Sequence, residues 1–257
     1  MSLNTHSKFY YGFTIDETNS SLDFKEGAPE IQATIDSGSY TPEELAVAIK
    51  TALDAVGANT YTVSFNRTTR VFTISTGSNF QLLVSTGSRA GSSIFSTIGL
   101  TGSDRTGAST YSGVASGSEY TTQFILQDYV PEENFRRAAY ASVNKSASGE
   151  VEVVTYGIER FFEMNFKFIT DVEMTNDCPI RNNPNGISDF LDFIRFATTK
   201  AKMEFMPDED DVNSFYKVIL ESEPSEKDGT GYKLKELYDK GLPGYYDSGV
   251  LKFMVVT

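Results

Sequence analysis

The sequence feature that most limits how this chain can fold is a stretch of small, polar residues between positions 84 and 118. Ser, Thr or Gly occupies 22 of these 35 positions, and the one sizeable apolar cluster comprises Ile94, Phe95, Ile98 and Leu100. Such a segment loses much conformational entropy on folding and buries little apolar surface in return. We therefore expect long loops around one short helical turn, and a domain boundary at the end of the stretch.

Length and charge agree with a division into two domains, 1–118 and 119–257. A chain of 257 residues is long enough for two parts of about 100–150 residues that each bury a core. The first part has 7 basic and 10 acidic residues, for a net charge of -3, whereas the second has 15 and 25, for a net charge of -10. We therefore predict an N-terminal module that includes the Ser/Thr/Gly-rich region, followed by a separate C-terminal domain.

The N-terminal part contains a clear helix signal. Thr41 as N-cap, Pro42 at the first helical position and Glu44 three residues after the cap satisfy the free N–H groups of a helix start, and Gly57 is typical of a helix end. Apolar residues recur between them at helical spacing. They are Leu45, Ile49, Ala52, Leu53 and Val56.

Alternating sequences after this helix predict β-strands. Residues 60–65 and 71–75 alternate apolar and polar side chains around a turn at 66–70, and residues 80–84 predict a further strand. The N-terminal part is therefore expected to be a small α+β module.

The C-terminal part is expected to be mainly β. One helix is predicted near 188–199, with Ser188 as its N-cap. The fold class is thus α+β and mainly β: the N-terminal module is followed by a β-sandwich or barrel with one packed helix. The predicted strands are 121–126, 138–143, 150–156, 159–168, 203–206, 215–221 and 250–256, with a hairpin turn at 146–149.

The composition argues against an enzyme. His6 is the one histidine and Cys178 the one cysteine, so a histidine-dependent triad and a cysteine-built metal site are disfavoured. Nucleotide-binding glycine motifs and the G-x-S-x-G motif are absent. We predict no catalytic residues, cofactor or resident metal. The acidic run Asp208–Asp211 favours a solvated turn, although a weak calcium site there stays open.

Aromatic residues are the candidates for assembly. Phe161, Phe162 and Phe166 lie in a strand with few polar gaps, which predicts burial on both faces or a place in an interface. Tyr129, Tyr245 and Tyr246 are added because tyrosine is enriched in protein–protein contacts. These six residues are predicted to lie in the core or in an assembly interface, and the alternative is a sugar-binding groove lined by aromatic rings.

The net charge of -13 bears on the partners of the protein. A strongly acidic surface repels nucleic acid phosphates and anionic lipid, so specific nucleic acid binding and membrane insertion are not expected. The polar N-terminus lacks the apolar core of a secretion signal, which predicts synthesis and assembly in a cytoplasm.

Two stretches resemble structural proteins of tailed bacteriophages. The first has a G-x-Y-T-x-x-E-L helix start, then a hairpin with Y-T-V and F-T-I, then a Ser/Thr/Gly-rich region with a short G-L turn; here these are 38–45, 61–63, 72–74 and 96–100. The second stretch, similar to the closing domain of tail and baseplate proteins, covers 190–208, 216–221 and 233–238. The resemblance implies a virion component, most plausibly a distal-tail or baseplate adaptor that joins the tail tube to the tip. Such proteins form homo-oligomeric rings, often sixfold, and contact other tail proteins.

Two other function classes stay in contention. A host-receptor or carbohydrate-binding module of the virion would use the 84–118 region or exposed tyrosines. A wall-degrading hydrolase would need two carboxylates across a cleft, for which a chain with 35 acidic residues offers no specific support.

Overall fold

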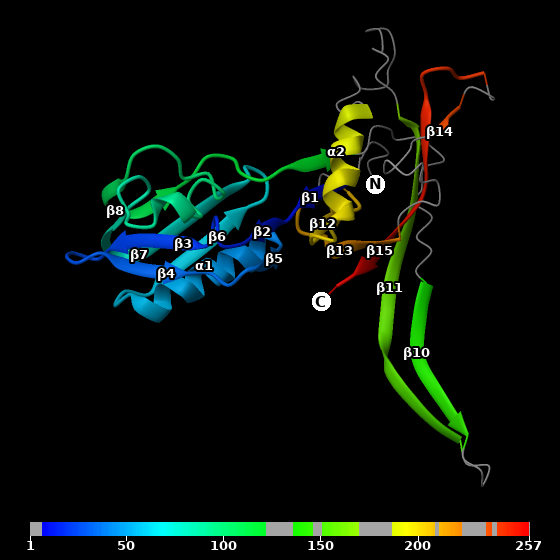
Figure 1. Ribbon diagram of the computed structural model, residues 1–257, viewed down its shortest axis with the longest axis horizontal. Coiled ribbons are helices and arrows are strands. Elements are labelled where there is room, and N and C mark those ends of the chain that lie inside the picture. Colours follow the sequence, from blue (N-terminus) through cyan, green and yellow to red (C-terminus); the bar gives the residue numbers. More distant parts are fainter. Residues whose placement is uncertain are drawn as a thin grey trace. The chain divides into compact units, whose positions relative to one another are not determined.

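The computed structural model describes residues 7–121, 136–145, 151–169, 187–208, 211–222, 235–237 and 241–256. The chain forms two units, which Figure 1 shows in colours that follow the sequence. Unit 1 consists of Met1–Phe9, Tyr120–Lys200 and Phe205–Thr257, and unit 2 consists of Tyr10–Glu119 and Ala201–Glu204. The chain therefore passes between the units four times, once between Lys200 and Ala201 and three times within strands. These strands are β1 (Lys8–Tyr11), β9 (Glu119–Thr121) and β12 (Met203–Met206).

Unit 2 is built on a five-stranded antiparallel sheet. Its strand order is β4-β3-β7-β6, with β8 on the other side of β7, and β2 and β5 pair separately. The strands are β2 (Phe13–Ile15), β3 (Ser21–Lys25), β4 (Ile31–Thr34), β5 (Gly38–Tyr40), β6 (Tyr61–Asn66), β7 (Val71–Leu82) and β8 (Arg105–Ser112), joined by α1 (Pro42–Val56) and the 3₁₀ turn η1 (Ala90–Ser92).

The predicted N-terminal helix is confirmed as α1. Its start is a capping box, because the Glu44 N–H donates to the Thr41 hydroxyl and the Thr41 N–H donates to the Glu44 carboxylate. The Gly57 N–H donates to the Leu53 carbonyl at the helix end, 2.8 Å away. Leu45, Ile49 and Leu53 lie on the buried face.

The predicted hairpin at 61–75 is also confirmed, with Tyr61 opposite Thr76 and Asn66 opposite Val71. The strand expected at 80–84 is, however, the continuation of β7. The polar residues 76–79 do not end β7, because β8 pairs with this strand both before and after them. The register of this pairing shifts between Ser75 and Phe80, so residues 76–79 form an irregularity within the strand.

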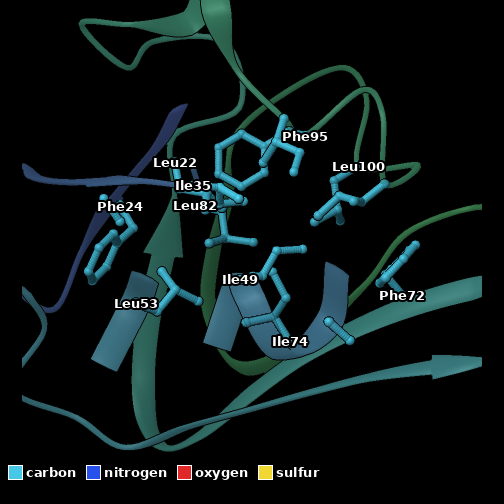
Figure 2. Packing of buried hydrophobic residues seen from close by; sticks show 14 of the residues in the cluster. Leu22, Phe24, Ile35, Ile49, Leu53, Phe72, Ile74, Leu82, Phe95 and Leu100 are labelled. Atoms are coloured by element: carbon cyan, nitrogen blue, oxygen red, sulfur yellow. The ribbon is translucent and has the colours of Figure 1, made fainter. Parts of the chain in front are cut away.

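The expectation of long loops around one short helical turn in 84–118 agrees with residues 84–104, which contain the short turn η1, but is wrong for part of the remainder. Residues 105–112 form β8, whose pairing with β7 supplies the stabilisation that its own Ser/Thr/Gly composition does not. The cluster of Ile94, Phe95, Ile98 and Leu100 is almost completely buried. Figure 2 shows Phe95 and Leu100 directed toward Ile49 and Leu82, so this segment supplies part of the core of unit 2.

The main sheet has the strand order β10-β11-β15-β13-β12-β1-β9, with β14 paired to β15. Its remaining elements are β10 (Arg136–Lys145), β11 (Val151–Ile169), β13 (Tyr216–Ser222), β14 (Lys235–Glu236) and β15 (Tyr246–Val255), together with the helix α2 (Ile187–Thr198). The mainly β fold class with antiparallel sheets and two α-helices is therefore confirmed, and the described strands form no closed barrel.

Two local expectations for this part of the chain need correction. The strands expected at 150–156 and 159–168 are one strand, β11. Strand β10 pairs with residues before and after Gly157, and β15 continues the pairing from Phe161 onward. The helix α2 already includes Ile187, so Ser188 lies within its first turn rather than at the N-cap. The turn at 146–149 and most of the strand expected at 121–126 lie outside the described residues. No described helix is long and apolar enough to cross a membrane.

Candidate assembly surface

Strands β10 and β11 form a long two-stranded ribbon, drawn in green in Figure 1. They pair from Arg136 opposite Phe161 to Lys145 opposite Val151, with a bulge after Tyr140. Strand β15 pairs with β11 from Phe161 to Ile169. Within the described parts of the chain, residues 151–160 therefore have one neighbouring strand, β10.

Such a ribbon has two consequences for assembly. A two-stranded hairpin is marginally stable in water unless a third strand or another surface packs against it. Its outer edges also present backbone N–H and C=O groups that can pair with a strand from another chain. The outer edges of the ribbon are therefore suited to addition of a further strand.

Phe161 and Phe162 lie at the base of the ribbon, where β11 enters the sheet. Adjacent residues in a strand point to opposite faces, and both side chains are buried, so both faces of β11 are covered at this point. The ring of Phe162 lies 5.3 Å from the ring of Phe205 and 4.8 Å from that of Tyr216. On the other face, the Lys252 ammonium lies 3.8 Å from the centre of the Phe161 ring.

Phe166 belongs to an aromatic cluster inside unit 1. Its ring lies 5.5 Å from the ring of Phe190 and 6.1 Å from that of Tyr120. Phe9 and Phe193, whose rings are 4.9 Å apart, belong to the same cluster, and the ring of Phe9 also lies 4.8 Å from that of Phe205 and 5.2 Å from that of Phe253. Phe9 and Tyr120 carried no signal in the sequence because they lie in strands too short to show an alternating pattern.

The three tyrosine candidates lie elsewhere. Tyr245 and Tyr246 are partly buried, and Tyr246 pairs through its backbone with Ile169 of β11 and Glu236 of β14. The Tyr245 carbonyl accepts a hydrogen bond from the Leu237 N–H, 2.7 Å away. Tyr129 lies outside the described residues. The structure therefore places Phe161, Phe162 and Phe166 as buried residues of β11, and Tyr246 on the neighbouring strand β15.

Hydrogen bonds to two carboxylates, those of Asp23 and Asp104, hold the Ser/Thr/Gly-rich region of unit 2. Asp23, which is 3% exposed, accepts hydrogen bonds from the Arg89 backbone N–H at 2.6 Å and from its guanidinium Nε at 2.9 Å. The same guanidinium donates to the Ala33 carbonyl at 2.7 Å and to the Thr34 hydroxyl at 2.8 Å. This arrangement anchors the start of η1 to β3 and β4.

Asp104 links the two ends of the segment 85–104. Its carboxylate accepts hydrogen bonds from the Ser85 N–H at 2.8 Å and from the hydroxyl groups of Ser85 and Thr86. Burial acts to raise the pKa of Asp104, but these hydrogen bonds together lower it. The hydroxyl-rich segment 85–104 is therefore held in a defined conformation.

The described residues contain no group of three or more His, Cys, Asp and Glu residues that could hold a metal ion. In the acidic run, Asp208 and Asp211 are described, and Glu209 and Asp210 lie outside the described residues, as do His6 and Cys178. No protein-family model matches this chain, and no curated protein matches it.

Proposed function

We propose that this protein is a structural subunit of a bacteriophage tail, which assembles into a ring at the distal tail or baseplate and links the tail tube to the tip. The β10–β11 ribbon carries the proposal, because residues 151–160 have β10 as their one strand neighbour within the described chain. The sequence resemblance to tail proteins in 38–100 and 190–238 supports the same class.

Ring formation is the expected result when the ribbon of one subunit pairs with a strand of a second subunit. Addition of a strand from a second subunit to the outer edge of the ribbon is a heterologous contact, and such contacts close into a ring when each repeats by a fixed rotation. The edges are then covered in the assembled state only, which suits a subunit that is stable within the tail. The partners are other copies of this chain and the neighbouring tail proteins, in a virion assembled in the host cytoplasm.

The experiment that tests this function shortens the ribbon without disturbing its base. Replacement of residues 141–156 by Asn-Gly joins Tyr140 to Gly157, which lie opposite each other, through a two-residue turn. The matched control replaces residues 146–150 by the same Asn-Gly turn, which joins the paired residues Lys145 and Val151 and keeps the whole ribbon. The control should keep the circular dichroism of the wild type, whereas the shortened variant should lose only the β-strand signal of the deleted residues.

Light scattering after size exclusion, followed by negative-stain microscopy, measures the outcome. We expect rings with a central hole from the wild type and the control, and monomers from the shortened variant. Rings of unchanged size from the shortened variant would show that the ribbon does not mediate assembly. A wild type that is monomeric at every concentration would contradict the self-assembling ring.

A carbohydrate-binding module is the second candidate function. It is favoured by the segment 85–104, which Asp104 and Arg89 hold in place and which presents many hydroxyl groups. A glycan array probed with the full chain should then give signals that disappear when this segment is altered, whereas a tail subunit that acts only in assembly should give none.

A further inference from the structure

The strand register divides the β10–β11 ribbon into two faces of different composition. Directly opposite residues of an antiparallel pair lie on the same face, and successive residues alternate between the faces. One face, which we call face A, carries the pairs Ala139–Ile158, Ala141–Thr155 and Val143–Val153. The opposite face, face B, carries the pairs Ala138–Glu159, Ser142–Val154 and Asn144–Glu152. Face A is therefore the more apolar face of the ribbon.

The bulge in the ribbon preserves this division. Tyr140 lies opposite Gly157 and Ala141 lies opposite Thr155, so Tyr156 is an additional residue of β11. Strand β10 contains no additional residue and alternates without interruption, which keeps positions 139, 141 and 143 on one face. The apolar stripe of face A therefore continues from one side of the bulge to the other.

Basic residues lie at both ends of face A. Arg137 is directly opposite Arg160 at the base of the ribbon, and Lys145 is opposite Val151 at the other end. Like charges that are directly opposite in a sheet destabilise the strand pair. An acidic group from a partner would remove this repulsion between the two arginines and form charge-assisted hydrogen bonds with them. Face A, which has no acidic residue, is therefore complementary to an acidic surface.

A second copy of this chain is a partner of the required charge. The chain has a net charge of -13, whereas β10 has three basic residues and no acidic one. Duplex DNA would match the basic ends of face A, but its phosphates would not match the apolar centre and are repelled by the net charge of the chain. A two-stranded ribbon is also marginally stable until another surface packs against it. A second copy therefore fits face A better than a nucleic acid does.

We propose that face A of the ribbon packs onto the acidic surface of a second copy of this chain, whose carboxylates neutralise Arg137 and Arg160. The proposal rests on the assembly role proposed above, and it identifies the face and the partner that this role uses. When a strand is added to an edge, main-chain hydrogen bonds provide affinity and side chains provide specificity. Face A provides these side-chain contacts.

Two adjacent residues of β11 give a matched test, because Val153 lies on face A and Val154 on face B. Val153→Gln places a polar amide in the apolar contact and should raise the protein concentration at which half of the chains are assembled by about tenfold or more. Val154→Gln makes the same chemical change on the opposite face and should leave this concentration within about twofold of the wild type. Light scattering over a dilution series measures the concentration, and circular dichroism confirms that both variants fold.

Three results would overturn the proposal. Equal assembly of Val153→Gln and Val154→Gln would show that face A is not in contact, and weaker assembly of Val154→Gln alone would assign the contact to face B. Monomers of the wild type that bind duplex DNA would assign the basic ends of face A to phosphates. If Val153→Gln does not fold, Val143→Gln and Ser142→Gln supply the same comparison on β10.

The shortened ribbon distinguishes failure of this inference from failure of the assembly role. Rings that persist without residues 141–156 would refute the assembly role itself. Loss of those rings, together with equal assembly of the two glutamine variants, would leave the assembly role intact and refute only the contact through face A.

Discussion

At the scale of single residues, carboxylates organise the irregular segments of unit 2. Asp104 accepts the N–H and hydroxyl groups of Ser85, and Asp23 binds both the backbone and the guanidinium of Arg89. Glu26 accepts hydrogen bonds from two backbone N–H groups after α1, and these lower its pKa although burial acts in the opposite direction. A charge-assisted hydrogen bond to backbone N–H groups fixes a loop that has too little apolar surface to be held by packing.

The Asp104 contacts predict a dependence of stability on pH. The folded chain holds the pKa of Asp104 below its usual 3.8, so its contribution is complete above about pH 4 and is lost as the pH falls below that value. Asp104→Asn should lower the free energy of unfolding at pH 7 by about 1 kcal/mol. The difference from the wild type should shrink toward about pH 3, as measured by urea denaturation across this range.

A suitable control for this prediction is Asp192→Asn on α2. Asp192 pairs with Arg195 on an exposed surface, where an ion pair contributes little. The free energy of unfolding of Asp192→Asn should therefore stay close to that of the wild type at every pH. An Asp104→Asn variant with the same stability as this control at pH 7 would contradict the role assigned to Asp104.

At the scale of elements, β11 serves both as a core strand and as half of the ribbon. From Phe161 onward it pairs with β15 and carries buried aromatic side chains, whereas residues 151–160 pair with β10. A single strand thus connects the hydrophobic core of unit 1 to the proposed assembly surface. Changes at its base should therefore affect stability first and assembly second.

Replacement of Phe161, Phe162 or Phe166 by Ala tests this connection. All three side chains are at most 4% exposed, so each variant should lower the free energy of unfolding by about 3–5 kcal/mol through lost burial and a residual cavity. We also expect these variants to impair ring formation more than any single charge substitution does. Chemical denaturation and light scattering on the same samples measure both effects.

The matched control for these variants is Arg160→Ala, because Arg160 adjoins Phe161 on the same strand and is exposed. It should change stability by less than about 0.5 kcal/mol. If all three phenylalanines can be replaced without loss of folding or assembly, the role assigned to this part of β11 is wrong.

At the scale of the whole molecule, the net charge of -13 is the property most relevant to DNA. A ring with an acidic channel would let DNA pass without binding it, since phosphates and carboxylates repel each other. We predict no retention of linear duplex DNA in a gel-shift assay, even at about 50 mM salt. Retention that decreases as salt is added would contradict this prediction and would indicate a local basic surface.

The sequence by itself determined the features that depend on neighbouring residues. The helix α1, with its Thr41–Glu44 capping box, and the β6–β7 hairpin follow from contacts a few positions apart, and the mainly β class follows from repeated alternation. Among the candidate residues, the dense apolar run at Phe161–Phe166 was visible because so few polar positions interrupt it.

Only the tertiary structure decided which distant segments meet. Strand β8 has a composition typical of loops, and it is a strand because β7 lies beside it. Residues 201–204 belong to unit 2 because Gly12 and Arg67, more than 130 positions away, provide their partners. The stabilisation from strand pairing and from buried ion pairs depends on which segments are close in space. Local patterns of hydrophobicity do not indicate which distant segments are close.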